Sequence, residues 1–537
     1  MSPFQELVWT FPIFLYAETH YRFKYFFSIL RKAEPEVIAD APHRLEPGAN
    51  IPLLILAKDA DKYPATLHSV KVNLSQQGTI LREIDLIQEP VSLNKPLWWN
   101  VYELCCDDIR GWLDVEVCIH LDVNGTTKTY FTDNHRTSSH EPLRIFLSDD
   151  PLPRETGMFF GDAHTHSDRT NDQVEFGVPI AAAKQLSQSI GLSYFCVADH
   201  SYDLDDAVDD FTRNDPSLPK WGSLLEEIRQ HNPASQDFVV VQGEEVSCRN
   251  SKDQNVHLLL FGDDNFFAGS GDGAEQWLKT RSENSISEIL EKKQDLAVAF
   301  AAHPMESVSL LQRALLGRGP WTNEDMFDKR LTGIQFANGA MNSGFQAGYR
   351  AWIDVLLTGQ RLFCLAGNDA HGNFNRFRQI GIPFIRVRES DSQLFGKMRT
   401  GVFVQGQLDQ NHILESLSNG RSIITDGPVA NILMKGENTV SSLGSSYSGP
   451  SEFSVTASSS KEFGKIKGVK VFVGIIGDRA ENVFLSDGAV DQLQYSRAST
   501  IQVTAPSYLR AEIFTSSNNL SDGSSHFCYT NPIWLTP

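Results

Sequence analysis

The sequence predicts a multidomain α/β protein with all-β flanks, in which a (β/α)7 barrel lies between two β-sandwich-like domains. Three observations favour this fold class. Short apolar strands alternate with amphipathic helices in the middle of the chain, strand-like runs without helical periodicity occur on both sides, and 537 residues are too many for one ordinary core. We expect the domains at about 1–150, 151–400 and 401–537.

The two flanking regions carry the turn signals of antiparallel β structure. In the N-terminal flank, Asn124-Gly125 is a hairpin signal between two strand-like runs, and a proline-marked segment at 149–155 ends the region. In the C-terminal flank, residues 412–428 predict a helix, a strand and a tight turn, and a Gly/Ser-rich stretch at 436–453 precedes further strands. We therefore predict a β-sandwich in each flank.

Seven apolar runs predict the strands of the barrel. Most segments between them are amphipathic enough to form helices, but the link between the third and fourth runs is too short for one. In a barrel whose strands all run the same way, the carboxyl ends form one mouth, so side chains at these ends converge. The runs are GMFFGDAHTH, SYFCVADH, FVVVQGEEVS, NVHLLLFG, AVAFAAHP, GIQFANG and RLFCLAGNDAH.

Six of these seven runs supply candidate metal ligands. Residues two apart on a strand point to the same face, which favours ligation by the pairs His164–His166 and Asp369–His371. A lone histidine at a strand end is more often a hydrogen-bonded structural residue, but six of the fifteen histidines share this pattern, and independent structural roles do not explain that. The polar residues at the strand ends are His164, His166, Asp168, Asp172, Asp199, His200, Glu244, Glu245, His257, His303, Asn338, Asp369 and His371.

The types of these ligands predict the cofactor and the chemistry. Imidazoles and carboxylates without paired cysteines favour zinc, manganese or iron, and so many ligands predict two or three divalent metal ions per chain. Such ions make a bound water nucleophilic, so we expect metal-assisted hydrolysis. Asp199 and His200 are the candidate catalytic residues. Asp199 would take a proton or position His200, and an equally good alternative is that it only orients that imidazole.

Composition limits the partners and the compartment. The chain has 47 basic and 67 acidic side chains, and its net charge of −20 argues against binding to long nucleic acids or an anionic membrane. Seven scattered cysteines without a CxxC pair favour a reduced interior, and the apolar N-terminal stretch lacks the basic residues of a signal peptide. We therefore expect a cytoplasmic protein without a membrane partner; its protein partners are left open.

The candidate ligands, in this order, resemble the motifs of the PHP superfamily, named for polymerase and histidinol phosphatase. The resemblance covers about residues 156–372 and implies a distorted seven-stranded (β/α) barrel with a trinuclear metal site. The similar segments are 161–166 (GDAHTH), 198–200 (ADH), 243–245 (GEE), His257, His303 and 368–371 (NDAH). Later segments resemble a branch that contains predicted phosphoesterases and carbaryl-hydrolase-type esterases, namely 333–339, 420–422, 425–428 and 529–533.

The resemblance also implies which residues hold each ion. One set would be His164, His166, Glu245 and Asp369; a second would be Glu245, His257 and His303, with the glutamate bridging; and a third would be Asp172, His200 and His371. The third set departs from the family pattern, because Asp172 lies six residues after His166 where family members often have five. Asp168 therefore competes with Asp172 for this place.

Charge favours one substrate class. Three divalent ions bound by three carboxylates would leave a net positive charge, which suits a small-molecule phosphate ester. We therefore expect a phosphoesterase. The alternatives are hydrolysis of a carbamate or carboxylic ester at the same metal site, and a non-catalytic metal-binding module that carries interaction sandwiches. The candidate substrate contacts, any of which could instead be solvated loop residues, are Arg169, Arg249, Asn338, Arg376 and Arg378.

Overall fold

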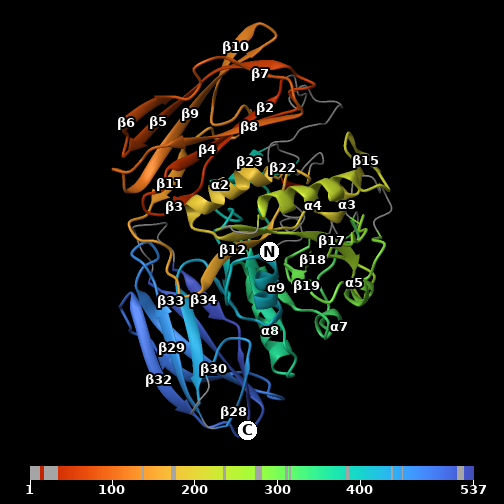
Figure 1. Ribbon diagram of the computed structural model, residues 1–537, viewed down its shortest axis with the longest axis vertical. Helices are drawn as coiled ribbons and strands as arrows, with labels where there is room; N and C mark the ends of the chain where they lie inside the picture. Colours follow the sequence, from red (N-terminus) through yellow and green to blue (C-terminus); the bar gives the residue numbers. More distant parts are fainter. Residues whose placement is uncertain are drawn as a thin grey trace, which may run out of the picture. The chain divides into compact units, whose positions relative to one another are not determined.

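The computed structural model of the protein describes residues 13–16, 34–135, 138–170, 177–233, 237–271, 281–308, 313, 316–382, 386–436, 440–449, 451–516 and 525–537. The described chain is mainly β structure, organised in several sheets with short helices (Figure 1). It divides into two compact units. Unit 1 comprises Met1–Asp149, Thr170–Gly191 and Ala370–Phe395, and unit 2 comprises Asp150–Arg169, Leu192–Asp369 and Gly396–Pro537.

Most of unit 1 is a pair of sheets that share one hydrophobic core. Alternate residues of its longest strand are buried, as expected for a strand with one face on a core. The larger sheet contains β3 (Arg44–Leu45), β11 (Leu143–Leu147), β9 (Gly111–Val123), β5 (Ala65–Gln76) and β6 (Thr79–Asp85), with β10 (Thr126–Phe131) on β9 and β7 (Val91–Leu93) on β5. The smaller contains β2 (Glu36–Asp40), β4 (Ile51–Lys58) and β8 (Leu97–Leu104).

Two later pieces of the chain complete unit 1. Helix α2 (Ile180–Ile190), which we expected among the barrel helices, belongs to this unit and contacts β3 and β4. It ends at Gly191, whose φ of 99° permits the left-handed conformation that closes a helix. A third sheet of unit 1 pairs β1 (Ile13–Tyr16) with β22 (Phe377–Ile382) and β23 (Arg386–Ser390).

Unit 2 contains the seven apolar runs in two sheets. An eleven-stranded sheet begins with three of them and continues into strands of the C-terminal region. Its order is β16 (Val239–Val241), β13 (Tyr194–Val197), β12 (Met158–Thr165), β24 (Arg399–Phe403), β25 (Ser422–Thr425), β34 (Phe527–Thr530), β33 (Ser507–Thr515), β30 (Ile466–Ile475) and β31 (Asn482–Asp487). A five-stranded sheet has the order β17 (Gly243–Arg249), β18 (Asn255–Phe261), β19 (Val298–Ala302), β20 (Gly333–Asn338) and β21 (Phe363–Gly367).

The strands of these runs do not all point the same way. Strands β12, β13 and β16 are mutually parallel, as are β19, β20 and β21, but β18 is antiparallel to both β17 and β19. The expectation of uniform direction is therefore wrong for β18. The reason is the short link at 250–254, because a parallel return needs a crossover of about a dozen residues. His257 near the start of β18 consequently pairs with Ser247 near the end of β17.

The two sheets of unit 2 approach each other at two places. A Cβ on Gly367, the last residue of β21, would lie 2.6 Å from the backbone nitrogen of His164 on β12, so only glycine permits this approach. An isolated parallel bridge joins His200, just after β13, to Glu245 on β17. The ends of strands from both sheets therefore lie side by side.

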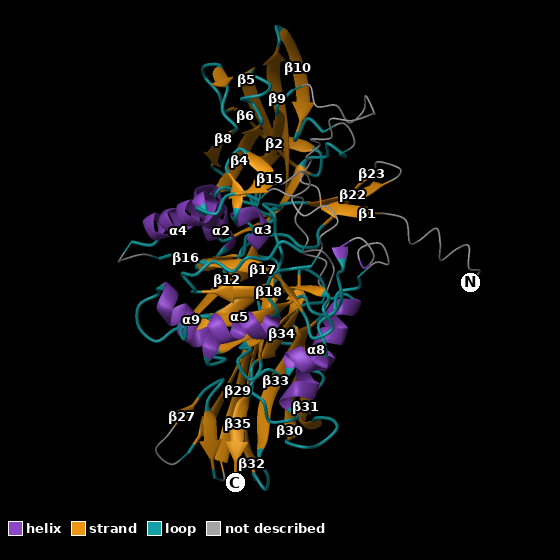
Figure 2. Cartoon of the chain, turned by 90° about the vertical axis from the view of Figure 1, so that its right-hand side faces the viewer, coloured by secondary structure: helices purple, strands orange, loops and turns teal. Residues whose placement is uncertain are grey.

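Helices cover the sheets of unit 2 (Figure 2). Helix α8 packs on β20 through a buried face that includes Phe345 and Trp352, and α9 contacts β16, β19 and β24. The helices are α3 (Ser201–Leu204), α4 (Pro219–His231), α5 (Ile286–Lys292), α7 (Asn323–Met326), α8 (Ser343–Leu356) and α9 (Gln410–Ser418). Among the described residues, we find no helix with the length and apolar character needed to cross a membrane.

The remaining strands of unit 2 are antiparallel additions. A four-stranded sheet has the order β27 (Val440–Ser441), β26 (Val429–Lys435), β29 (Ser451–Ser458) and β32 (Gln494–Ile501), and β26 contacts β33 and β34 of the large sheet. Strand β35 (Ile533–Thr536) pairs with β28 (Ser446–Ser448) and β33, and a small ribbon joins β14 (Asp206–Ala207) to β15 (Asp210–Asn214).

Candidate metal centre

The carboxylate of Glu245 lies among five imidazoles in unit 2. Its side chain is fully buried, and it comes from β17, whereas the imidazoles come from the ends of β12, β13 and β19 and the start of β18. The Oε1 atom is 2.9 Å from Nδ1 of His257 and 3.1 Å from Nε2 of His303. The Oε2 atom is 3.0 Å from Nδ1 of His200, 3.5 Å from Nε2 of His164 and 3.8 Å from Nε2 of His166.

Asp369 adds a second carboxylate from the end of β21. Its Oδ1 is 3.0 Å from Nε2 of His166 and 3.4 Å from Nε2 of His164. Asp369 has a φ of 52° and His303 a φ of 29°, so two non-glycine residues at strand ends adopt left-handed backbone conformations. Such strain collects at functional sites, where the surrounding structure holds a residue against its local preference.

Two groups of side chains in unit 2 have the composition and spacing of a metal site. Within each group, one nitrogen or oxygen from every residue lies within 4.8 Å of the others. Ligands about 2.1 Å from a shared ion have such separations, so the donors fit zinc or a similar divalent ion. The groups are His164, His166, Glu245 and Asp369, and His200, Glu245 and His257. The first is the set expected for the first ion; in the second, His200 joins Glu245 and His257, and His303 contacts the same glutamate oxygen.

Burial and charge act against each other on these groups. Burial by itself would raise the pKa of Glu245, but the imidazoles of His257 and His164 hold that pKa well below its usual value. Burial likewise opposes ionisation of Asp369, and His164 and His166 keep its pKa well below normal. Burial lowers the pKa of His164, yet Glu245 and Asp369 outweigh it and raise the pKa to about 9. The centre therefore holds ionised carboxylates beside a positively charged imidazole.

Asp162 ties the end of β12 to the loop that carries Asp369. Its Oδ1 accepts from the backbone nitrogens of His164 (3.2 Å) and Asn368 (3.1 Å). Its Oδ2 accepts from the Asn368 side chain (2.7 Å) and the Gly396 nitrogen (2.9 Å). Burial raises the pKa of Asp162 to about 6 despite these donors. Because Asn368 precedes Asp369, this carboxyl group fixes the spacing between two predicted ligands.

The predicted catalytic residue Asp199 anchors the segment after His166. Its Oδ1 accepts from the backbone nitrogen of Ser167 and its Oδ2 accepts from the Ser167 hydroxyl, each at 2.6 Å. These two hydrogen bonds go to Ser167 rather than to His200, and the predicted roles of Asp199 stay predictions. His200 stacks on Tyr202, with ring centroids 4.6 Å apart.

The predicted substrate contacts of unit 2 have partners within the protein. Arg169 forms ion pairs with Asp168 and Glu227, so Asp168, the alternative first-motif ligand, contacts an arginine. Arg249 donates to the Ser282 carbonyl oxygen (2.9 Å) and lies 3.1 Å from Asp253 and 3.4 Å from Glu288. Asn338 donates to Glu306 (2.9 Å). Substrate binding by these three side chains therefore stays a prediction.

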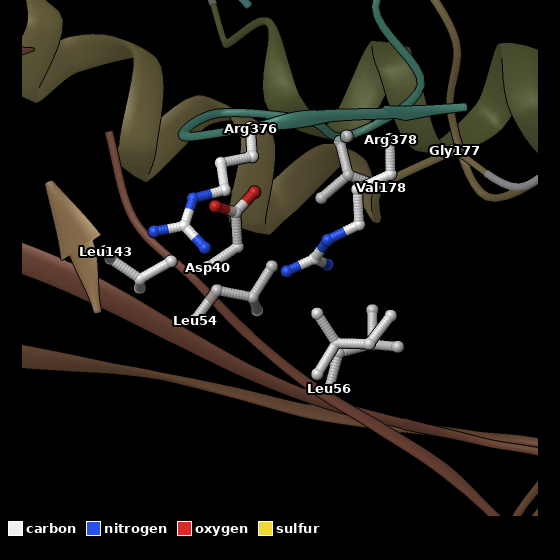
Figure 3. A pocket seen from close by; sticks show the side chains of 10 residues that line it. Asp40, Leu54, Leu56, Leu143, Gly177, Val178, Arg376 and Arg378 are labelled. Atoms are coloured by element: carbon white, nitrogen blue, oxygen red, sulfur yellow. The ribbon is translucent and has the colours of Figure 1, made fainter. Parts of the chain in front are cut away.

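The remaining predicted site residues belong to unit 1 or fall outside the described residues. Asp172 is outside the described residues. His371 is a buried residue of unit 1, where its backbone nitrogen donates to Asn373 (2.8 Å), so the third predicted ligand set is not assembled within unit 2 and stays a prediction. Arg376 and Arg378 also belong to unit 1, where they line a pocket with Asp40 and several aliphatic side chains (Figure 3).

That pocket of unit 1 brings the two arginines close to a buried carboxyl group. Figure 3 shows Asp40 lying between Arg376 and Arg378, above Leu54. Burial raises the pKa of Asp40 to about 7, although its Oδ2 accepts from the Phe374 nitrogen (2.9 Å). Arg378 is 3.0 Å from Asp133, and both arginines approach Glu389. Their ion pairs are thus with acidic groups of unit 1.

Three side chains near the centre were not singled out from the sequence. Arg318 is partly buried, and its Nη2 is 2.6 Å from Nε2 of His257. Gln335 Oε1 lies 3.0 Å from His164 Nδ1, and Glu306 accepts from Asn338. A signal existed for Gln335, because it is a polar residue inside the otherwise apolar run GIQFANG. Arg318 and Glu306 lie in loops, where the sequence has no comparable signal.

Comparison with known proteins finds likeness only at the level of solved structures. No family model matches the sequence, and no curated protein matches it. The structures that match include a glycosyl hydrolase family 2 member from Bacteroides cellulosilyticus DSM 14838, with 9% identity, coverage of 93% of this chain and 62% of that chain, and a TM-score of 0.15. Bacteroides uniformis beta-glucuronidase matches with 8% identity, 93% and 61% coverage, and a TM-score of 0.18.

Beta-D-mannosidase from Dictyoglomus thermophilum also matches, with 8% identity, coverage of 93% of this chain and 67% of that chain, and a TM-score of 0.22. This chain thus spans 62% and 61% of the length of the first two neighbours. At these identities and TM-scores, the substrates of the neighbours are not carried over to this chain.

The predicted membership of the PHP superfamily is corrected, because no family model matches the sequence and the structures named above are glycoside hydrolases by their descriptions. The phosphoesterase activity and the phosphate ester substrate inferred from that resemblance are corrected with it. Hydrolysis of carbamate or carboxylic esters and a non-catalytic module find no support among the neighbours either. The physical reason is that short histidine and aspartate motifs at strand ends describe ligand chemistry, which recurs on unrelated folds and fixes neither family nor substrate.

Proposed function

We propose that unit 2 is a metal-dependent hydrolase whose two ligand groups hold a pair of divalent ions that share Glu245. The observation that carries this proposal is that the buried carboxylate of Glu245 belongs to both ligand groups, one with His164, His166 and Asp369 and the other with His200 and His257. A carboxylate shared by two ligand groups is suited to bridge two ions. Zinc, manganese and iron suit the mixture of imidazole and carboxylate donors.

The residues of the chain have separate tasks in this proposal. Bound divalent ions would supply an acidified water and a polarised substrate bond. His164, His166 and Asp369 would hold one ion, and His200 and His257 the other. The rest of the site positions these ligands: Asp162 fixes the β12 end, and Asp199 fixes the Ser167 segment.

Arg318 supplies a cation at the edge of the centre. Its backbone bridges to Asn255 at the start of β18, which places its guanidinium beside His257 on the same strand. The side chain is partly exposed, so it is accessible to a substrate while it remains next to the ligands. We propose that it binds an oxygen of the substrate, because guanidinium groups donate strongly to polarised or anionic oxygens.

The fold proposed for this part of unit 2 is a distorted (β/α)7 barrel made from the five-stranded sheet with β12, β13 and β16. It is supported by the approach of β21 to β12 at Gly367 and by the bridge between His200 and Glu245. Gly367→Ala tests the first contact: we expect a loss of about 2–3 kcal/mol in stability, because the added methyl group would overlap His164. An alanine variant as stable as the wild type would contradict the closure.

A cytoplasmic location also stays part of the proposal. It is supported by the seven cysteines, all of which are free thiols in the structure. Fractionation of cells that produce the protein at its native level tests it, and recovery in an oxidising compartment would contradict it.

Metal removal tests the proposed activity. The protein is stripped with EDTA, reloaded with manganese or zinc, and assayed against chromogenic glycosides and amides. We expect turnover of at least one class only after reloading, and a loss of roughly a hundredfold or more in Asp369→Ala. Asp354→Ala, which removes an exposed aspartate of α8, is the matched control and should retain activity. Hydrolysis that survives both EDTA and Asp369→Ala would contradict the proposal.

A further inference from the structure

A line of side-chain hydrogen bonds runs from Glu306 to His164. Asn338 Nδ2 donates to Glu306 Oε1 (2.9 Å), and Gln335 Nε2 donates to Asn338 Oδ1 (3.1 Å). Gln335 Oε1 in turn lies 3.0 Å from Nδ1 of His164. Gln335 and Asn338 both come from β20, and Glu306 follows His303 beyond the end of β19. Glu306, Asn338 and Gln335, which are outside the ligand groups, are therefore connected by hydrogen bonds to the ligand His164.

The direction of this line is fixed at its outer end. A carboxylate has only acceptor oxygens, so Asn338 must turn its NH₂ group toward Glu306. The carbonyl oxygen of Asn338 then faces Gln335 and requires a donor, which is the NH₂ group of Gln335. The remaining oxygen of Gln335 can only accept, so Nδ1 of His164 must donate to it.

A second contact fixes the direction at the inner end. The backbone nitrogen of His303 points at the same Gln335 Oε1, at 3.4 Å. A backbone N–H is always a donor, so the atom it faces has to be the amide oxygen. The carboxylate at one end and the backbone amide at the other thus demand the same orientation of Gln335. This agreement removes the usual ambiguity between the oxygen and nitrogen of an amide.

The orientation decides which nitrogen of His164 is available to a metal. With its proton on Nδ1 held by Gln335, the imidazole presents Nε2, which lies 3.5 Å from Glu245 and 3.4 Å from Asp369. Glu306 also lies near a second imidazole, because its Oε2 is 3.9 Å from Nδ1 of His303. His303 Nε2 then faces Glu245, at 3.1 Å. The carboxylate of Glu306 is therefore connected to His164 through hydrogen bonds and lies near His303, and these two imidazoles face different oxygens of Glu245.

We propose that Glu306 is a positioning residue that acts through Asn338 and Gln335 to fix Nε2 of His164 as its metal-binding nitrogen. The effect on metal binding rests on the centre proposed above, whereas the orientation of His164 does not. Asn338 thereby gains a structural role in the site in place of the substrate contact expected from the sequence. Partners of this kind typically change metal affinity by about 10- to 100-fold when they are removed.

Two substitutions at Gln335 separate orientation from packing. Gln335→Leu removes the acceptor, and we expect metal affinity to fall roughly 10- to 100-fold. Gln335→Glu loses the donor to Asn338 but keeps oxygens that accept from both His164 and His303, so we expect a loss of only about three- to tenfold, as for a break at the outer end. Equal losses in the two variants would overturn the proposal, because a packing role alone predicts them.

Glu306→Gln tests the outer end without touching the core. Its side chain is 36% exposed, so the variant should fold, and its amide lets the line of hydrogen bonds run in either direction. We expect a fall in metal affinity of roughly three- to tenfold. Glu324→Gln, on the exposed side of α7, makes the same charge change and should have no effect. An unchanged affinity in Glu306→Gln would also overturn the proposal.

Nitrogen-15 spectra of the imidazoles provide a readout that needs no metal. The metal-free protein is recorded at increasing pH until the signals of His164, assigned by their loss in His164→Gln, are those of a neutral imidazole. We expect the Nδ1–H form in the wild type and in Gln335→Glu, and a mixture of both forms in Gln335→Leu. A wild-type spectrum with the proton on Nε2 would overturn the proposal. Failure of the metal centre itself would instead appear as absent metal binding beside the expected spectrum.

Discussion

Replacing Glu245 with glutamine removes the negative charge around which five imidazoles gather. The pKa of His164 is raised from 6.5 to about 9 by Glu245 and Asp369, against the effect of burial. One pKa unit corresponds to about 1.4 kcal/mol, so the net effect of the two carboxylates, after the opposing effect of burial, favours the imidazolium by about 3 kcal/mol in the folded protein. Both lie at similar distances from His164, 3.5 Å for Glu245 and 3.4 Å for Asp369, so we expect the loss of Glu245 to remove about 1–2 kcal/mol of this net effect.

The sign of the pH dependence follows from the raised pKa of His164. The stabilisation is fully present below the unfolded value of 6.5 and is lost as the pH rises through about 9. In urea unfolding of the metal-free protein, the free energy of unfolding of Glu245→Gln should therefore lie about 1–2 kcal/mol further below that of the wild type at about pH 6 than at about pH 10. Bound metal should also fall from two ions per chain to one or none, because the variant lacks the shared ligand.

Glu244→Gln is the matched control for this experiment. Glu244 is the preceding residue on β17 and is equally buried, but its Oε1 accepts from the backbone nitrogen of Phe267 (3.1 Å), and burial raises its pKa well above the usual value, which disfavours a negative charge there. We expect unfolding and metal content close to those of the wild type. The reasoning is refuted if the two variants behave alike, or if the deficit of Glu245→Gln is independent of pH.

Three further predictions address other parts of the centre. Metal uptake at about pH 7 should release roughly one proton from His164, so metal affinity measured by calorimetry should rise with pH up to about 9; an affinity independent of pH would contradict the charge assigned to that imidazole. Asp162→Ala should lower stability by about 3–6 kcal/mol in urea unfolding, because it leaves four buried donors without their acceptor, and a loss under about 1 kcal/mol would be inconsistent with that role. Arg318→Gln should raise KM roughly tenfold or more while metal content stays unchanged, whereas an unchanged KM would remove Arg318 from the substrate site.

The sequence predicted the convergence of polar side chains better than the architecture that carries them. Alternation on strands and convergence at strand ends predicted that these side chains would meet, and the family resemblance implied the set His164, His166, Glu245 and Asp369, whose ligand atoms do lie within 4.8 Å of one another. The same rules could not set the direction of β18. That direction depends on a link at 250–254 that is too short for a crossover. The expectation that all strands run the same way did not take this link into account.

Residues outside the strands were harder to place from sequence. Arg376 and Arg378 follow the Asp369 motif closely, yet the chain passes into unit 1 at residue 370, and both arginines line a pocket there. A short distance along the sequence does not reveal that the chain has passed from one unit to the other. Arg318 and Glu306 reach the centre from loops, whose course depends on tertiary contacts that no periodicity encodes.

Family and substrate were the least predictable features. Ligand motifs such as 161–166 and 368–371 report which donors a site needs, and those needs are the same for many reactions. A substrate is selected by side chains around the ions, and these occupy positions with no shared spacing. The predicted family is corrected, but the proposed metal centre is argued from the distances around Glu245, which do not depend on the family.

The most direct test of the account is the number of metal ions that the purified chain binds. Metal-free protein is equilibrated with excess manganese or zinc, freed of unbound ions, and analysed for metal and protein. We predict two ions per chain in the wild type and a loss of at least one in Asp369→Ala, with no loss in Asp354→Ala. A wild-type chain that retains no divalent ion would contradict the central claim.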